Sequence, residues 1–219
     1  MIRGAIFDMD GLLLDTEAQS AECWPRAAAE QGLVVTREML HAITGTNHDT
    51  SRRMMTEFLG PAMDFERLYA RAADLIFEVM KEKGMPTRPY AREILEELQA
   101  AGVKLALATS TNRDKAEEEM RGAGLWDFFS VVCFGNEVAH GKPAPDIFLL
   151  AAERLGLAPA ECAVLEDSSN GVAAGVAAGM ESLWIPDQIT PEERPDTAEL
   201  ATHVFPTLRE ASAHLLREI

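Results

Sequence analysis

Two aspartates separated by one residue, Asp8 and Asp10, follow a short apolar segment at residues 5–7 and precede Gly11. If this segment is a β-strand, residues two apart face the same side, and both carboxylates converge on one site. Such a pair provides a nucleophile and a general acid or base, but the carboxylates repel each other and require a cation or a shared proton. The glycine permits a tight turn with N–H groups that face an anion. An isolated Asp-x-Asp sequence is more often an acidic strand end that caps a loop. The other motifs of the chain are therefore needed to decide between this interpretation and an active site.

A hydroxyl-rich turn at residues 109–112 follows a second apolar segment. Serine, threonine and asparagine commonly begin helices, so an ordinary helix cap explains this turn. The alternative is a phosphate cradle, in which Thr109, Ser110 and Asn112 bind anionic oxygens together with N–H groups of the following helix. These residues alone do not separate the two interpretations.

Lys142 is one of only five lysines, and Pro143 and Pro145 restrict the backbone directly after it. Most lysines are solvated. A lysine held in this way, however, is suited to neutralise a carboxylate and a phosphoryl group together.

An acidic pair, Glu166 and Asp167, ends another apolar segment, and Ser168 follows it. Asp167 or Ser168 is well suited to cap the next helix. Asp167 is equally suited to offer an oxygen ligand to magnesium, opposite Asp8 and Asp10.

Apolar and helical segments alternate along most of the chain. The apolar segments are continuous, as in strands that are covered on both faces. We expect strands at residues 3–8, 103–109, 130–134, 162–166 and 181–185, and a weaker one at 203–205. Helical segments that end at a glycine before the next strand are typical of βαβ units, and we expect helices at residues 91–101, 113–122, 146–155 and 170–178. The predicted fold is α/β, with a doubly wound parallel sheet.

Residues 16–86 break this alternation, because their pattern is helical and contains no convincing strand. The three- and four-residue spacing is clearest at Leu68, Ala72, Leu75, Ile76 and Val79. We expect a helical domain at 16–86, inserted into a core domain formed by residues 1–15 and 87–219. The glycine and prolines of residues 84–89 suggest a hinge, with a second near Thr16.

With 219 residues, of which 47% are hydrophobic, the chain can bury a substantial core. We find no apolar segment long enough to span a membrane and no secretory signal sequence, so we expect a cytoplasmic protein. We also expect a monomer. The net charge of −16 argues against nucleic acid or an anionic membrane as partner. The negative net charge does not exclude a small anionic substrate, because local cations and helix N-termini at a binding site can offset that charge.

The three cysteines lie far apart and show no disulfide framework. The five histidines show no H-x-x-x-H spacing and no cluster with cysteine, so the sequence predicts no zinc site. Any metal would be held by carboxylates, which favours magnesium.

In order along the chain, the Asp-x-Asp-Gly motif, the Thr-Ser turn, the Lys-Pro pair and the Glu-Asp pair each come after a predicted strand. This order resembles the haloacid dehalogenase superfamily of phosphotransferases. The segments DMDGLLLDTE, GKPAPDIF and LEDSSNGVAAGVAAGM are similar to the branch that contains β-phosphoglucomutase and related sugar-phosphate phosphatases. The resemblance covers nearly the whole chain, and it implies a helical cap inserted just after the first motif.

The resemblance implies a role for each matching residue. Asp8 would be the nucleophile that accepts the phosphoryl group, and Asp10 would protonate the leaving alcohol and then deprotonate the attacking water. Thr109 would donate a hydrogen bond to the phosphoryl oxygens. Lys142 would offset negative charge on these oxygens and on Asp8.

The implied cofactor is Mg²⁺, with Asp8, Asp10 and Asp167 as the metal-binding residues, Asp10 through its backbone carbonyl. Glu166 is either a further ligand or a residue that supports the ligands. Dehalogenases in the strict sense need no magnesium and lack the second aspartate, so Asp10 together with Asp167 favours phosphoryl transfer.

The resemblance also defines an alternative, a mutase that binds a second phosphate in its cap. β-Phosphoglucomutases carry a histidine, an arginine and a lysine in the cap. Here Ser20 lies near the position of that histidine, His48 stands where the arginine is expected, and residues 16–80 contain no lysine. Arg52 and Arg53 would compensate only if they faced the substrate, and a solvated helix turn explains them better. The missing lysine also argues against a phosphonoacetaldehyde hydrolase.

Glu17, Trp24 and His48 are the candidates for substrate contacts from the cap. A place in the core of the cap explains Trp24 better, and a surface or capping role explains His48 better. We expect a magnesium-dependent phosphatase that acts on a small phosphorylated metabolite, either a sugar phosphate or a nucleoside monophosphate. A regulatory or binding protein on a retired catalytic scaffold is the other alternative, but it predicts the loss of a motif residue, and all are present.

Overall fold

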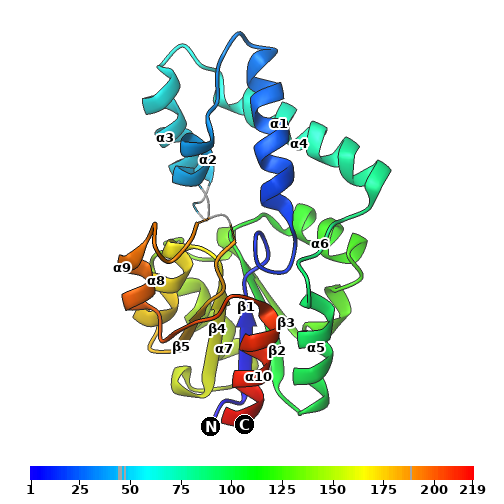
Figure 1. Cartoon of the computed structure of the whole chain (residues 1–219), viewed down its shortest axis with the longest axis vertical. Helices are drawn as coiled ribbons and strands as arrows, with labels where there is room; N and C mark the ends of the chain where they lie inside the picture. The colour runs from blue at the N-terminus through cyan, green and yellow to red at the C-terminus, as the bar shows by residue number, and fades with distance from the viewer. Residues whose placement is uncertain (44–45, 47, 188) are drawn as a thin grey trace.

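Six parallel strands form a single sheet in the order β3-β2-β1-β4-β5-β6 (Figure 1). The computed structural model describes the chain except residues 44, 45, 47 and 188 and the side chains of Glu17, Ala18 and Lys83. The strands are β1 (Gly4–Phe7), β2 (Lys104–Thr109), β3 (Val131–Phe134), β4 (Cys162–Glu166), β5 (Glu181–Trp184) and β6 (His203–Val204). All six predicted strands are present, so the doubly wound α/β fold is confirmed.

Helices cover both faces of this sheet, which explains the continuous apolar strands. Along β1, Ala5 and Phe7 pack on one face, with α5 (Ala91–Ala100), α6 (Arg113–Gly122) and α10 (Leu208–Glu218). Ile6 packs on the other face, with α7 (Asp146–Leu155) and α8 (Ser169–Ala177). The short helix α9 (Pro195–Leu200) lies beside α8 (Figure 1), and short 3₁₀ helices occur at Trp126–Phe128, Gly135–Glu137 and Pro159–Glu161. Among the described residues, no helix is both long and apolar enough to cross a membrane.

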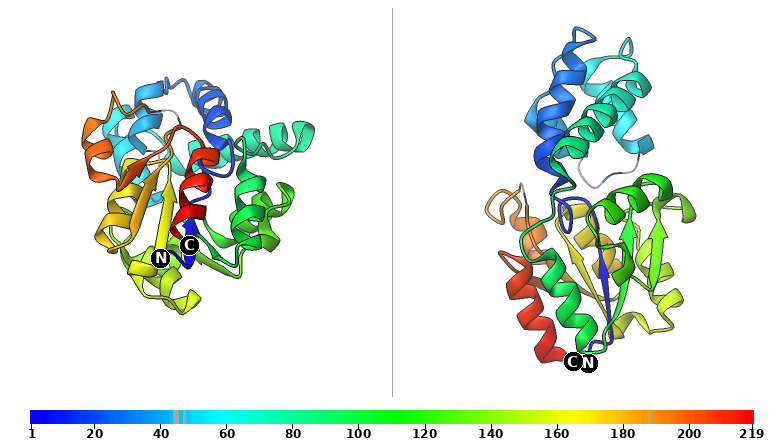
Figure 2. Two further views of the ribbon diagram at one scale, coloured as in Figure 1. Left: turned by 60° about the horizontal axis from the view of Figure 1, so that its bottom comes forward. Right: turned by 90° about the vertical axis from the view of Figure 1, so that its right-hand side faces the viewer.

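The described part of residues 16–83 forms four helices, which make up a separate cap above the carboxyl ends of the strands (Figures 1 and 2). They are α1 (Thr16–Ala29), α2 (Arg37–Ile43), α3 (His48–Leu59) and α4 (Phe65–Lys83). The cap has its own apolar core, to which α4 contributes Phe65, Leu68, Ala72, Leu75 and Ile76. The helical spacing recognised in the sequence therefore marks the buried face of α4. Both chain termini lie at the opposite end of the molecule (Figure 2).

The two linkers between cap and core run side by side. The N–H of Asp15 donates to the carbonyl of Pro86 at 3.0 Å, and the N–H of Arg88 donates to the carbonyl of Leu13 at 2.9 Å. Leu14 and Thr87 form an antiparallel bridge between these bonds. The inserted helical cap is thus confirmed, while the boundaries at residues 16 and 86 and the hinge stay predictions.

Candidate active site

The first motif lies at the centre of the sheet, where β1 is flanked by β2 and β4. The chain winds in opposite directions on the two sides of β1, so its carboxyl end opens into the crevice where α/β sheets bind ligands. Asp8 directly follows β1 and is 8% exposed. Gly11 has a φ of +79°, and a Cβ at this position would lie 2.2 Å from Oδ2 of Asp167. Glycine therefore allows the turn after β1 to approach the acidic pair after β4.

A single buried ammonium group connects the first, third and fourth motifs. Nζ of Lys142 donates to Oδ1 of Asp8 and to Oε1 of Glu166, both at 2.5 Å, and to the carbonyl oxygen of Ala108 at 3.1 Å. Burial lowers the pKa of Lys142, but the carboxylates of Asp8 and Glu166 outweigh that effect and raise it overall. Burial raises the pKa of Asp8 to about 8, although Lys142 opposes this shift. One cation thus serves two buried carboxyl groups.

Glu166 is held by the turn that begins α8. Its Oε2 accepts hydrogen bonds from the N–H of Ser168 at 3.2 Å and from the Ser168 hydroxyl at 3.0 Å. The same hydroxyl accepts from the N–H of Gly171 at 3.1 Å and so caps the helix. A Cβ on Gly171 would lie 1.8 Å from the carboxyl carbon of Glu166. The capping interpretation of this motif is therefore correct for Ser168, and the cap also fixes Glu166 against Lys142.

The side chain of Asp10 accepts hydrogen bonds from the hydroxyl groups of Thr16 and Thr111, and the sequence analysis did not predict this role for either threonine. The Thr16 hydroxyl donates to Oδ1 at 3.0 Å, and the Thr111 hydroxyl donates to Oδ2 at 2.8 Å. Thr16 begins the first cap helix, and Thr111 belongs to the turn after β2. Asp10 is therefore positioned by the cap and the core together. Thr111 was within the hydroxyl-rich motif, but no spacing rule singled it out.

The hydroxyl-rich turn faces the same site. Thr109 is buried, and its hydroxyl accepts a hydrogen bond from the N–H of Thr111 at 3.0 Å. Ser110 and Asn112 line the cavity above it. Asn112 precedes α6, but its side chain makes no capping hydrogen bond. The helix-cap interpretation therefore does not account for the side chain of Asn112.

Three buried acidic residues, Asp8, Glu166 and Asp167, each place a carboxylate oxygen within 4.8 Å of the others. The ammonium group of Lys142 contacts two of them, Asp8 and Glu166. A cluster of carboxylate oxygens is an all-oxygen donor set, which fits Mg²⁺. The side chain of Asp10 is not part of this group, so its predicted role rests on its backbone carbonyl.

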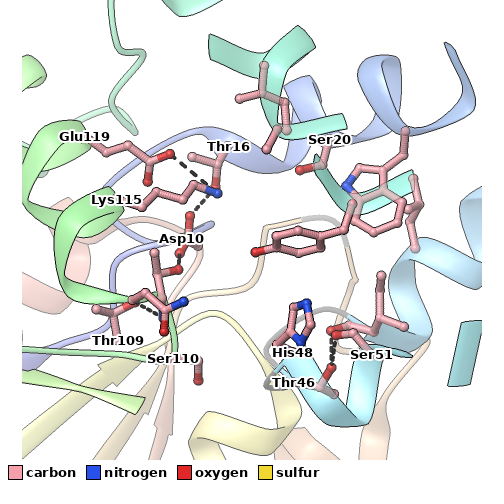
Figure 3. Close-up of a pocket in the computed structure, with 18 of the residues that line it drawn as sticks. Asp10, Thr16, Ser20, Thr46, His48, Ser51, Thr109, Ser110, Lys115 and Glu119 are labelled. Atoms are coloured by element: carbon pink, nitrogen blue, oxygen red, sulfur yellow. Dashed lines mark hydrogen bonds and ion pairs between the residues drawn. The ribbon is translucent and has the colours of Figure 1, made fainter. Parts of the chain in front are cut away.

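A cavity of about 200 Å³ separates this part of the core from the cap (Figure 3). Asp8, Asp10 and the turn at 109–112 line its core side, and Ser20, Trp24, His48 and Tyr69 line its cap side. The aromatic side chains of the cap form a cluster. Trp24 lies 6.0 Å from Tyr69, and the His48 ring lies 5.0 Å from Tyr69 and 5.3 Å from Phe65, measured between centroids.

Trp24 and His48, two of the three cap candidates, therefore line the cavity, and Trp24 also belongs to the cap core. The prediction for Glu17 lies outside the described side chains. His48 pairs with Glu66 at 3.2 Å. Arg52 pairs with Asp49 at 3.2 Å at the cap surface, and neither Arg52 nor Arg53 is among the described residues that line the cavity.

One charged pair in the cavity was not predicted from the sequence. Lys115 and Glu119 reach in from α6 beside Asp10 (Figure 3), with 3.7 Å between Nζ and Oε1. Burial raises the pKa of Glu119 to about 7, and Asp10 adds to this shift while Lys115 opposes it. Burial lowers the pKa of Lys115, but Glu119 and Asp10 raise it overall. Oε2 of Glu119 is buried and has no hydrogen-bond partner among the described residues.

The comparison with known proteins assigns this architecture to a family. The model of the haloacid dehalogenase-like hydrolases matches residues 2–179, and the chain belongs to this family, as the motifs indicated. The phosphorylated carbohydrates phosphatase of Thermotoga maritima is 36% identical over 187 residues, which cover 84% of each chain. Hexitol phosphatase A of Escherichia coli is 35% identical over 183 residues, which cover 84% of this chain and 82% of that relative.

A solved structure is also similar to this chain over nearly its whole length. The crystal structure of CbbY from Rhodobacter sphaeroides in complex with phosphate matches with a TM-score of 0.79 and 27% identity. The match covers 94% of this chain and 95% of that one. The similarity therefore extends over the cap as well as the core.

Proposed function

We propose that this chain is a magnesium-dependent phosphatase that hydrolyses a small phosphomonoester, a sugar phosphate or a nucleoside monophosphate, through an aspartyl-phosphate intermediate. The observation that supports this most is that Asp8 and Asp10 line one cavity, while Lys142 binds Asp8 and three buried carboxylates, those of Asp8, Glu166 and Asp167, cluster together. Family membership supports the same class, as do relatives named for phosphatase activity on phosphorylated carbohydrates and hexitols.

In the first step, a carboxylate oxygen of Asp8 attacks phosphorus, and the bond from phosphorus to the ester oxygen breaks. Asp10 enters this step protonated and gives its proton to the departing oxygen, and hydrogen bonds from Thr16 and Thr111 hold its side chain at the cavity wall. Asp10, now a carboxylate, then removes a proton from water, whose oxygen attacks phosphorus. The bond to Asp8 breaks, and inorganic phosphate is released.

The remaining residues stabilise the negative charge on Asp8 and on the phosphoryl oxygens during these steps. Lys142 stays bound to Glu166. Its ammonium group can donate to Asp8 before the transfer and to the phosphoryl oxygens after it, and so stabilises negative charge on both. Thr109, Ser110 and Asn112 offer donors to the same oxygens. Asp8 and Asp167, with the backbone carbonyl of Asp10, would hold Mg²⁺, which supplies further neutralisation of the phosphoryl charge when bound. We assign Glu166 to the support of Lys142, because both of its oxygens are engaged by protein donors.

The charged pair on α6 supports a polyhydroxylated leaving group. Lys115 offers donors and Glu119 offers an acceptor at the side of the cavity, next to Asp10. A sugar or polyol presents neighbouring hydroxyl groups that match such a pair. Trp24 and Tyr69 add aromatic surface on the cap side, against which a ring can pack. A sugar phosphate is therefore the substrate that the cavity favours.

A mutase needs cationic groups in the cap that hold a second phosphate. His48 is paired with Glu66, and Arg52 is paired with Asp49 outside the cavity lining. We therefore propose hydrolysis over isomerisation. The cytoplasmic location, the monomeric state and the movement of the cap about residues 84–89 are part of the same proposal.

A panel of phosphomonoesters tests this function. Purified protein with Mg²⁺ should release inorganic phosphate from several sugar phosphates, and excess chelator should abolish the release. β-Glucose 1-phosphate should give free phosphate and glucose, even when hexose bisphosphate is supplied as primer. Efficient formation of glucose 6-phosphate with little free phosphate would establish the mutase instead, and full turnover in chelator would exclude the metal site.

A further inference from the structure

Three side chains that commonly bind metals meet at the end of the sheet remote from the cavity. Glu181 is the first residue of β5, His203 is the first residue of β6, and His214 lies on α10. Their ligand atoms all lie within 4.8 Å of one another. Oε1 of Glu181 lies 2.7 Å from Nε2 of His214 and 3.7 Å from Nε2 of His203.

The backbone fixes this arrangement from three directions. His203 is in register with Leu183, which lies two residues from Glu181 and so faces the same side of the sheet. That side packs against α10 through Leu208, Ala211 and Leu215. The three ligand residues therefore come from rigid, well-packed elements, as a preformed metal site requires.

An ordinary ion pair accounts for only part of the geometry. Glu181 and His214 would form such a pair alone. The second imidazole, that of His203, lies 4.4 Å from the His214 ring between centroids, and its Nε2 lies 3.7 Å from the same carboxylate oxygen. A divalent ion between the three groups would replace one weak contact by strong bonds, since zinc binds imidazole nitrogen and carboxylate oxygen at about 2.0–2.2 Å.

Exposure of the three side chains matches an open three-ligand site. Glu181 is 18% exposed and His214 is 13% exposed, whereas His203 is 45% exposed. The inner ligands are held in place, and the outer one can rotate by a small amount to complete the set. Water can then occupy a fourth position on the solvent side.

We propose that Glu181, His203 and His214 bind one transition-metal ion, with Zn²⁺ as the best fit. Imidazole ligands select zinc, copper or nickel over magnesium, so this site and the carboxylate site beside Asp8 take different ions. The sequence predicted no zinc site because its histidines show no H-x-x-x-H spacing and no cluster with cysteine. Pairing of β5 with β6 and packing of α10 bring them together. A bound ion would connect α10 to the sheet edge and stabilise the folded state.

Tag-free protein in excess Mg²⁺ is titrated with Zn²⁺ by calorimetry, and separately with Co²⁺ by visible absorption. We expect one site, and a Kd at least tenfold weaker in His203→Ala and His214→Ala. His140→Ala is the matched control, because His140 is an exposed histidine with a carboxylate partner, Asp146, outside this cluster. Zn²⁺ should raise the Tm of the wild type and of His140→Ala, but not of His203→Ala.

Equal zinc affinity in the wild type and in His203→Ala would overturn the proposal, and so would zinc binding that Mg²⁺ displaces completely. His203 is half exposed, so His203→Ala should fold normally, and circular dichroism checks this. The measurements use no substrate, so they are independent of the proposed phosphatase function. Magnesium-dependent turnover, where present, should be unchanged in His203→Ala.

Discussion

The core wall and the cap wall of the cavity hold their polar groups in different ways. Behind the core wall, Lys142, which binds Asp8, and Glu166 have side chains that are 2% and 0% exposed, and hydrogen bonds engage both. On the cap wall, the side chains of His48 and its partner Glu66 are 40% and 62% exposed. Buried charged pairs are fixed in position and costly to break, whereas exposed pairs contribute little. We therefore expect the core wall to serve one chemistry and the cap wall to select the substrate.

The largest expected effect is on the core wall. Asp8→Asn should abolish turnover, because it removes the proposed nucleophile but keeps the shape of the side chain. Loss of a nucleophile costs about 10⁶ in kcat in a well-studied hydrolase. Phosphate release from a sugar phosphate measures the loss, and circular dichroism verifies the fold. Rates near those of the wild type in a folded Asp8→Asn protein would contradict the proposed role of Asp8 and the assignment of the chemical step to the core wall.

Lys142→Met should reduce both activity and stability. It removes the only described cation in contact with Asp8 and Glu166, and breaking a buried charged pair in this way costs about 3–5 kcal/mol. Loss of electrostatic stabilisation at the phosphoryl group should lower kcat by about 10²–10³. Urea unfolding and steady-state kinetics measure the two effects.

The double variant Lys142→Met with Glu166→Gln sharpens this test. It removes the cation together with one of its two carboxylates, so it should recover part of the stability and none of the activity. A double variant that is less stable than Lys142→Met would mean that packing, and not charge, explains the loss.

Much of this core wall was predictable from the sequence. The apolar strands of a parallel sheet end at one edge, so Asp8, Thr109 and Glu166 had to lie near one another once the strands were recognised. Lys142 follows no strand directly, and its place beside Asp8 came from the family resemblance. The helical spacing of Leu68 and its neighbours likewise predicted the buried face of a cap helix.

The contacts that the sequence did not reveal depend on the packing of elements distant in the chain. Thr16 reaches Asp10 only because the cap begins directly above β1, and Lys115 faces the cavity because of the rotation of α6. His203 and His214 meet because α10 returns to the sheet edge. Each of these contacts needs the relative orientation of two elements, which local patterns do not specify.

Glu119 provides a test of intermediate size, because it is a core-wall group without a complete set of partners. Its pKa of about 7 in the folded protein lies above the value of 4.5 for an unperturbed glutamate. The folded state therefore binds more protons than the unfolded state between these values, and stability falls as pH rises through this window. Glu119→Gln should be more stabilising at pH 8 than at pH 4.5, by about 1–3 kcal/mol.

Urea unfolding of the wild type and of Glu119→Gln at the two pH values measures this difference. Glu118→Gln is the matched control, because Glu118 is the exposed neighbour on the same helix. A stability difference that does not change with pH would show that Glu119 is solvated in the protein and does not belong with the buried core wall.

The smallest expected effect is on the cap wall, and it tests the division between the two walls directly. His48→Gln keeps a polar side chain against Tyr69 but changes the group that faces the substrate. We expect kcat/KM to change by about tenfold among different sugar phosphates, as loss of one substrate contact does. Hydrolysis of a generic aryl phosphate should change little, because an aryl leaving group carries no sugar hydroxyl groups that His48 could bind and its phosphoryl group depends on the core. Arg53→Ala, at the surface of the cap, is the control for nonspecific effects of cap substitution. Equal losses with sugar phosphates and aryl phosphate in His48→Gln would mean that the cap takes part in the chemical step, and the separation of chemistry from selection would then be wrong.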